Sequence, residues 1–169
     1  DIINNDLANT IGNLLNRTSS MSRKWFDNRV PSNEMLSKDN TLELYAKKTV
    51  ENYFRHFNSY ELDLAANVIL SLAINTNLYL NEKQPWTLIK DEKNIPLVSN
   101  IIYNVLESTR IVGLLLLPIL PNLSSKIDQQ LGLLYNEKES WKKQLDWGKL
   151  IHESILPAPN PVIEKLEYE

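Results

Sequence analysis

Two polar residues, Asn13 and Arg17, stand four positions apart in a segment with helical apolar spacing. Residues four apart project side by side from a helix. At about 100° per residue, this pair lies roughly 120° from the centre of the stripe formed by Ile3, Leu7 and Ile11. An amide offers a donor and an acceptor, and a guanidinium can grip acceptors or stack on a ring. The pair therefore suits the edge of a nucleic-acid base, although an ordinary solvated helix face has the same spacing.

A second candidate is the dipeptide Pro85-Trp86, which falls in a connection between two helical patterns. Proline can present the indole rigidly, and a nucleotide base stacked on an indole gains roughly 1–3 kcal/mol. Lys90 follows about one turn later and is placed to contact a phosphate. The alternative is that Trp86 is a plug packed on the helices, which is the usual role of a tryptophan in such a connection.

Basic residues are concentrated after the Asn13 and Arg17 pair. Arg17, Arg23, Lys24 and Arg29 face only one acidic residue, Asp27, in this stretch. A local positive patch suits phosphate contacts, and Arg23 and Lys24 are the candidates for them. A basic loop without any partner would show the same composition.

The inventory of catalytic groups is short. The chain has no cysteine and only two histidines, His56 and His152, which excludes thiol nucleophiles and histidine-rich or cysteine-based metal sites. His56 ends an aromatic helix face and suits a packed or capping role, and His152 has only sequence neighbours rather than a triad. The four glycines of the chain form no phosphate-binding loop. We expect no catalytic residue, no metal and no cofactor in this chain.

Composition limits the class of protein. At 169 residues, 43% apolar and 23% charged, the chain can bury a proper core, and it fits a single domain over 1–169. The net charge of −3 argues against indiscriminate binding to long nucleic acid or anionic membrane. The most apolar run, Ile111–Leu120, is shorter than the roughly 18 residues needed to span a membrane, and it contains Pro118. Without a signal sequence at Asp1–Asp6, we expect a cytoplasmic location.

Apolar residues recur with helical spacing nearly throughout, which predicts an all-α, up-and-down bundle of about five main helices. The predicted helices cover about 6–21, 42–57, 62–80, 96–117 and 121–131. The first connection, about 27–40, is marked by Pro31, Ser32 and Asn33, and the third by a turn over 81–86. Glu61 is placed to cap the third helix, Pro96 to begin the fourth and Gly132 to close the fifth.

The predicted core bundle spans about 5–132, and an irregular tail follows over about 133–169. Trp141 and Trp147 are expected to pin this tail to the bundle. Its end, Pro161–Glu167, alternates weakly between apolar and polar residues and is expected to run extended along the helices.

Together these motifs resemble the anticodon-binding domain of methionyl-tRNA synthetase, a class I aminoacyl-tRNA synthetase. The opening Asn5–Arg17 is similar to the family signature just after the catalytic half, and Asn81–Lys90 is similar to its Pro-Trp anticodon loop. Trp147-Gly148 and Pro161–Glu167 resemble the end of its core. The likeness spans essentially the whole chain.

The resemblance implies a helical bundle that recognises the CAU anticodon of methionine tRNA. Residues matching Asn13, Arg17 and Trp86 receive the unstacked wobble cytosine and its neighbours, while Pro85 positions the loop. It implies a partner catalytic domain that uses ATP and whose signature motifs are absent from this sequence. The appended C-terminal domain of some members is also absent, so a monomer is expected.

One segment departs from the family pattern, and two rival interpretations remain. The sequence has Val162-Ile163-Glu164 where the family more often has Leu-Phe-Pro, which affects how the tail packs. One rival is the anticodon domain of a related class I synthetase, for cysteine, leucine, isoleucine or valine. The other is a helical protein-interaction module whose exposed Trp86 anchors a partner.

Overall fold

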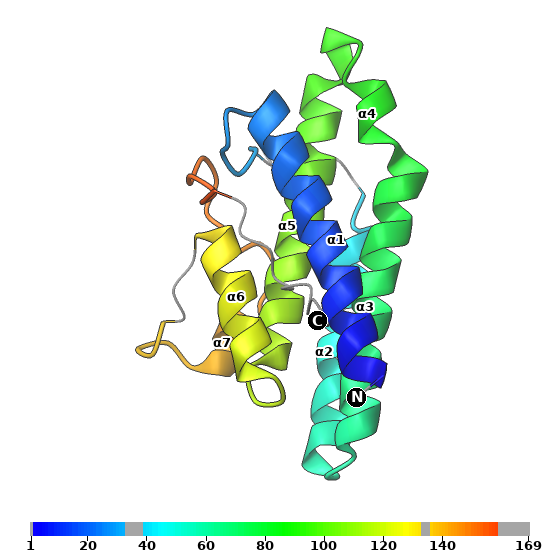
Figure 1. Ribbon diagram of the computed structural model, residues 1–169, viewed down its shortest axis with the longest axis vertical. Helices are drawn as coiled ribbons and strands as arrows, with labels where there is room; N and C mark the ends of the chain where they lie inside the picture. Colours follow the sequence, from blue (N-terminus) through cyan, green and yellow to red (C-terminus); the bar gives the residue numbers. More distant parts are fainter. Residues whose placement is uncertain (1, 33–38, 133–135, 159–169) are drawn as a thin grey trace, which may run out of the picture.

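The computed structural model describes residues 2–32, 39–132 and 136–158. Within them, the helices are α1 (Ile2–Trp25), α2 (Thr41–Asn58), α3 (Leu62–Lys83), α4 (Pro85–Leu88), α5 (Ile95–Leu116), α6 (Pro121–Leu131) and α7 (Trp141–Gln144), with a 3-10 turn at Glu92–Asn94. Consecutive long helices run in alternating directions (Figure 1). The predicted all-α, up-and-down bundle with five main helices is confirmed. The predicted path of Pro161–Glu167, and Asn33 of the first connection, lie outside the described residues.

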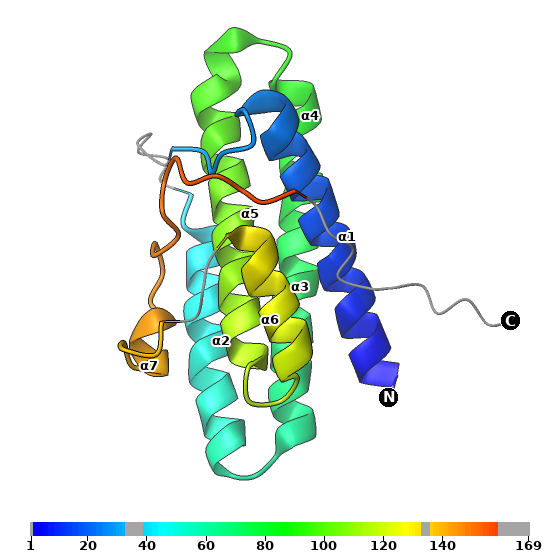
Figure 2. The same cartoon turned by 60° about the vertical axis from the view of Figure 1, so that its left-hand side comes forward.

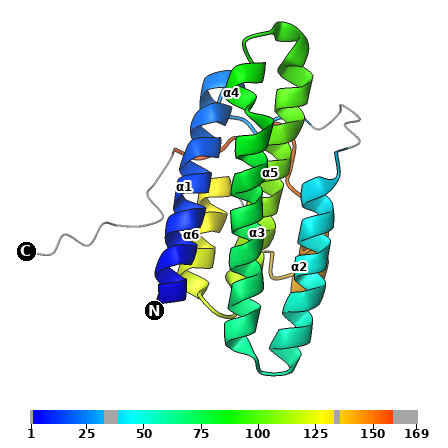
Figure 3. The ribbon, with the colours of Figure 1, turned by 90° about the vertical axis from the view of Figure 1, so that its right-hand side faces the viewer.

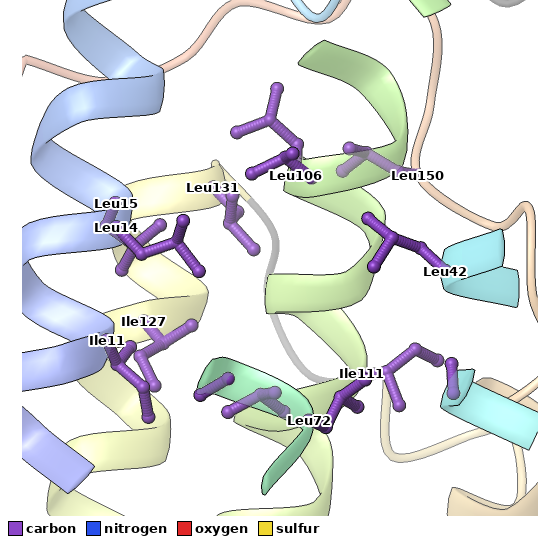
Figure 4. Packing of buried hydrophobic residues seen from close by; sticks show 14 of the residues in the cluster. Ile11, Leu14, Leu15, Leu42, Leu72, Leu106, Ile111, Ile127, Leu131 and Leu150 are labelled. Atoms are coloured by element: carbon purple, nitrogen blue, oxygen red, sulfur yellow. The ribbon is translucent and has the colours of Figure 1, made fainter. Parts of the chain in front are cut away.

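The central helix of the bundle is α5. It is buried on all sides from Val98 to Leu116 and contacts α1, α2, α3, α4 and α6. On the face shown in Figure 3, α3 lies between α1 and α2, with α5 behind. Leucine and isoleucine side chains from α1, α2, α3, α5 and α6 interlock at the centre (Figure 4). Burial on every side explains why α5 carries the most apolar run of the sequence.

That apolar run belongs to the core, as predicted. Ile111 to Leu116 are buried among the other helices. No helix within the described part of the chain is long and apolar enough to cross a membrane.

The helix α1 runs several residues beyond its predicted end near Met21. Trp25 packs against the core, so the apolar stripe continues to the end of the helix. The basic Arg23 and Lys24 lie in the last turn, where the negative end of the helix dipole stabilises positive charge. The chain then reverses at Asp27 and Asn28, whose φ angles are 51° and 58°. Asp and Asn tolerate this left-handed conformation better than most residues, so they set where α1 ends.

The helix α3 also extends beyond its predicted end near Leu80. Asn81 to Lys83 were predicted to form a turn, but they complete the last turn of α3. The residue before a proline is disfavoured in the α region, so the break falls at Gln84, which is left-handed with a φ of 46°. Pro85 then begins the single turn of α4. The predicted loop is therefore a helix–helix corner.

The predicted cap on α3 is wrong in its side-chain role. Glu61 stands at the N-cap position, but its side chain makes no capping hydrogen bond. Its carboxylate instead lies 2.7 Å from His56 Nδ1 across the hairpin between α2 and α3. The contact still joins the two helices at this corner. The other two helix ends follow prediction: Pro96 lies in the first turn of α5, and the left-handed Gly132 closes α6.

The tail is attached to the bundle, as predicted from its tryptophans. Trp141 Nε1 donates to the Leu114 carbonyl over 2.8 Å, and its ring meets Phe54 edge-on at 5.4 Å. Trp147 packs half-buried against the core. Figure 2 shows the tail, in orange, passing from α7 back across the bundle toward α1. There it pairs with the segment after α1, where the Val30 amide donates to the Ser154 carbonyl.

A buried ion pair on α5 also attaches the tail. Both Glu107 oxygens accept hydrogen bonds from Arg110, at 2.6 and 2.8 Å. The same carboxylate accepts the backbone amides of Gly148, Lys149 and Leu150 at 2.7 to 3.1 Å. Arg110 in turn donates to the carbonyls of Gln144 and Asp146. One charged pair therefore holds the backbone of the tail between residues 144 and 150.

Candidate nucleic-acid interface

Arg17 is held in a fixed orientation by two asparagines of the neighbouring helix. Its Nη1 donates to Asn77 Oδ1 over 3.0 Å, and its Nη2 donates to Asn81 Oδ1 over 2.9 Å. Asn77 and Asn81 are four residues apart on α3, so their amides lie side by side opposite α1. The two bonds fix the plane of the guanidinium, which carries five N–H donors in all.

Trp86 lies against this fixed guanidinium. The Arg17 Cζ atom is 5.6 Å from the centre of the indole ring, within the range of a cation–π contact. Pro85 is buried, which anchors the start of α4 on the bundle, while the Trp86 side chain stays 39% exposed. At this exposure Trp86 packs in part on the bundle and leaves part of its surface open to solvent. Pro85 anchors the corner and Trp86 presents an aromatic surface.

A surface pocket of about 420 Å³ opens beside this pair. Arg17 and Trp86 form part of its lining, and the rest comes from Asn16, Ser20 and Met21 of α1. The pocket thus offers an aromatic ring and a largely apolar lining that includes Met21, with a guanidinium beside them, a combination that suits a flat ring stacked on the indole.

The structure brings together some of the predicted site residues and leaves others apart. Arg17, Pro85 and Trp86 meet at the corner between α1, α3 and α4. Asn13 is exposed one turn earlier on the same face of α1, and it is absent from the lining of the pocket. It can extend the surface along α1.

Three predicted phosphate contacts are exposed. Lys24 lies seven residues after Arg17, which at about 100° per residue places both on nearly the same face of α1. Arg23 lies on another face of that last turn, and Lys90 follows α4 by two residues. Arg29 is engaged elsewhere, because its Nη1 donates to the Glu153 carbonyl in the tail.

Both histidines contact other side chains of the fold. The His152 ring stacks on Tyr103 at 4.5 Å, and the Tyr103 hydroxyl donates to the Leu150 carbonyl. His56 pairs with Glu61, as described above. Within residues 2–32, 39–132 and 136–158, no group of three or more potential ligand side chains is arranged to hold a metal ion.

Asn77 and Asn81 are the site residues that the sequence analysis missed. Their spacing of four residues, equal to that of Asn13 and Arg17, was the available signal. Asn81 was predicted to lie in the turn, and Asn77 was not singled out, so neither amide was placed against α1.

Comparison with known proteins gives a family for this arrangement. The family model described as the anticodon binding domain of methionyl tRNA ligase matches residues 30–168. A methionine–tRNA ligase of a Nostoc species is 35% identical over 98% of this chain and 32% of its own length. That of Lactococcus lactis is 32% identical over 99% of this chain and 25% of its own length. This chain therefore spans about a third or less of these relatives.

Solved structures agree with the sequence comparison, and both cover α1, which precedes the residues matched by the family model. Apo methionyl-tRNA synthetase of Mycobacterium tuberculosis matches 99% of this chain with a TM-score of 0.85 and 31% identity, over 34% of that chain. The same enzyme in complex with methionyl-adenylate matches 95% of this chain with a TM-score of 0.84 and 32% identity, over 31% of that chain. The helical fold, the matched residues and these relatives agree, and the chain belongs to the family of anticodon-binding domains of methionyl-tRNA ligases.

Proposed function

We propose that this chain recognises the CAU anticodon of methionine tRNA and receives an unstacked base at the pocket beside Arg17 and Trp86. The observation that carries the proposal is the contact between a fixed guanidinium and a half-exposed indole at the mouth of that pocket. A base can stack on the indole, and its ring acceptors can take hydrogen bonds from the guanidinium.

The neighbouring groups fit the same role. Asn13 can offer its amide to a second base one turn along α1, and Lys24, Arg23 and Lys90 can meet phosphates around the loop. These few cations stand on a chain of net charge −3, so binding depends on the local surface rather than on overall attraction. Such a surface favours a short folded RNA loop over long nucleic acid.

The chemistry of aminoacylation would belong to the rest of the parent protein. Because the chain spans a third or less of its relatives, we assign activation of methionine with ATP to a separate catalytic domain. This chain would act as one monomeric binding unit attached to that domain, in the cytoplasm where translation takes place. It would bind tRNA without catalysing the reaction.

A wobble-base comparison tests this function. An RNA stem-loop with the anticodon CAU is compared with one that carries UAU, by filter binding at one salt concentration. Because cytosine and uracil present different donors and acceptors to Arg17 and Asn13, we expect CAU to bind about ten times more tightly or better. Equal binding of both stem-loops would contradict methionine anticodon recognition. Binding of neither would favour the protein-interaction module instead.

The Arg17→Lys variant is expected to bind the CAU stem-loop about tenfold more weakly, with most of the preference for CAU lost. Lysine keeps the positive charge, but a single ammonium cannot bridge Asn77 and Asn81 and still present a planar fork to a base. Fluorescence anisotropy with both stem-loops measures the effect. Arg55→Lys, an exposed change on α2, is the matched control. Unchanged affinity and preference in Arg17→Lys would show that charge alone matters at position 17.

A further inference from the structure

The last turn of α3, just before the corner that carries Trp86, is tied to the start of α2. Lys83 Nζ lies 2.6 Å from Asp39 Oδ2 and 5.3 Å from the centre of the Tyr79 ring. The Tyr79 hydroxyl donates to the same carboxylate oxygen over 3.3 Å. Tyr79 is itself buried in the core, so these contacts link the exposed end of α3 to a fixed point.

Asp39 serves both helices with one carboxylate. Its Oδ1 accepts the Thr41 amide over 3.1 Å at the start of α2, while its Oδ2 faces α3. Burial alone would raise the pKa of this carboxyl group, but hydrogen bonds from Lys83 and Thr41 outweigh it and lower the pKa to about 2. Asp39 is therefore charged throughout the neutral range.

The corner at Gln84, directly after Lys83, depends on contacts made by the residues on either side of it. Gln84 is a left-handed residue with a side chain, a strained conformation that persists where surrounding contacts impose it. Pro85 holds one side of this residue through its burial. Lys83 is the neighbour on the other side, and its side chain is fixed by Asp39. Trp86 lies only three residues beyond Lys83.

We propose that Asp39 and Lys83 are positioning residues for the RNA surface: their ion pair fixes the last turn of α3, and thereby sets the Gln84 corner and the angle at which Trp86 meets Arg17. Neither residue needs to touch RNA for this role. The inference rests on the proposed function for its RNA readout.

A direct phosphate contact by Lys83 is the competing explanation. The two explanations predict opposite changes in RNA affinity when the charge of Asp39 is removed. If Lys83 served RNA, removing the charge of Asp39 would free the lysine and reduce repulsion, and binding would tighten. If the pair positions Trp86, the same change loosens the corner, and binding weakens despite the more favourable charge.

The Asp39→Asn variant is compared with Glu43→Gln by anisotropy on the CAU stem-loop. Glu43 forms an exposed ion pair of the same 2.6 Å length with Lys47 on α2, so the control changes the net charge equally. We expect Asp39→Asn to weaken binding about three- to tenfold and Glu43→Gln to leave it unchanged or slightly tighter. Lys83→Arg, which keeps the ion pair, should bind like the wild type. Equal or tighter binding by Asp39→Asn would overturn the proposal.

A second readout does not depend on RNA. The chain has four tryptophans, so labelling with 5-fluorotryptophan gives four fluorine resonances, and Trp86→Phe identifies the one from Trp86. In free Asp39→Asn we expect that resonance to shift or broaden while those of Trp25, Trp141 and Trp147 stay in place. An unchanged Trp86 resonance would refute positioning, even with RNA affinity lost. If wild-type chain does not bind the stem-loop but Trp86 responds to Asp39→Asn, the proposed function fails and the positioning role stands.

Discussion

Replacing Trp86 by alanine is expected to weaken binding of the CAU stem-loop by about ten- to a hundredfold. A base stacked on an aromatic side chain is worth roughly 1–3 kcal/mol, and about 1.4 kcal/mol corresponds to a factor of ten. The indole is also the ring beside which the Arg17 guanidinium rests, so its removal takes away one wall of the pocket. Both effects act on binding. Some stability should also be lost, because most of the residue is covered at an exposure of 39%.

Anisotropy with a labelled stem-loop gives the affinity, and circular dichroism checks that the helices remain. Tyr45→Ala on α2 is the matched control, since Tyr45 is an aromatic residue of similar exposure, 45%, away from the corner. Trp86→Phe should recover part of the lost affinity because phenylalanine keeps a smaller stacking face. If Trp86→Ala bound as well as Tyr45→Ala, stacking on Trp86 would have no part in recognition.

The helices were predictable because their physical signal is local. Apolar side chains at helical spacing define each stripe, and Pro96, Pro121 and Gly132 mark ends through backbone constraints that act on one or two residues. The errors fell where tertiary contacts decide. The end of α1 depends on how Trp25 packs, and the end of α3 depends on the corner at Gln84. Neither contact is visible in a periodic pattern.

The site was only partly predictable for the same reason. The pairing of Arg17 with Trp86 came from resemblance to a family, because each residue alone also fits a structural role. Asn77 and Asn81 contact Arg17 across 60 and 64 residues of sequence. Their spacing of four places them on one face of α3, but only the fold brings this face against α1. Asp39 and Lys83 are likewise joined only by the fold.

Glu107 shows most plainly what a sequence alone conceals. In the sequence it is one carboxylate within a long apolar helix, three residues before Arg110. Such a pair resembles a common surface ion pair between successive turns. In the structure the Glu107 side chain is completely buried, and it accepts three amides from a tail some forty residues further along the chain.

The isosteric change Glu107→Gln is therefore expected to cost about 3–5 kcal/mol of unfolding free energy, the usual consequence of removing one partner of a buried ion pair. Glutamine keeps the volume, but its NH₂ group must face N–H donors that the carboxylate accepted, and Arg110 is left with an uncompensated charge. For a chain of this length the melting temperature should fall by roughly 6–20 °C. Thermal and urea unfolding followed by circular dichroism measure both quantities.

A surface pair supplies the control for this prediction. Glu139 forms an exposed ion pair with Lys149 at 2.8 Å, and pairs of this kind contribute about 0–1 kcal/mol. Glu139→Gln should therefore melt close to the wild type. Limited proteolysis adds a local test, because the tail between 144 and 150 should be cut sooner in Glu107→Gln if the carboxylate holds it. A melting temperature within a degree or two of the control, together with an equally protected tail, would mean that the tryptophan contacts alone attach the tail to the bundle.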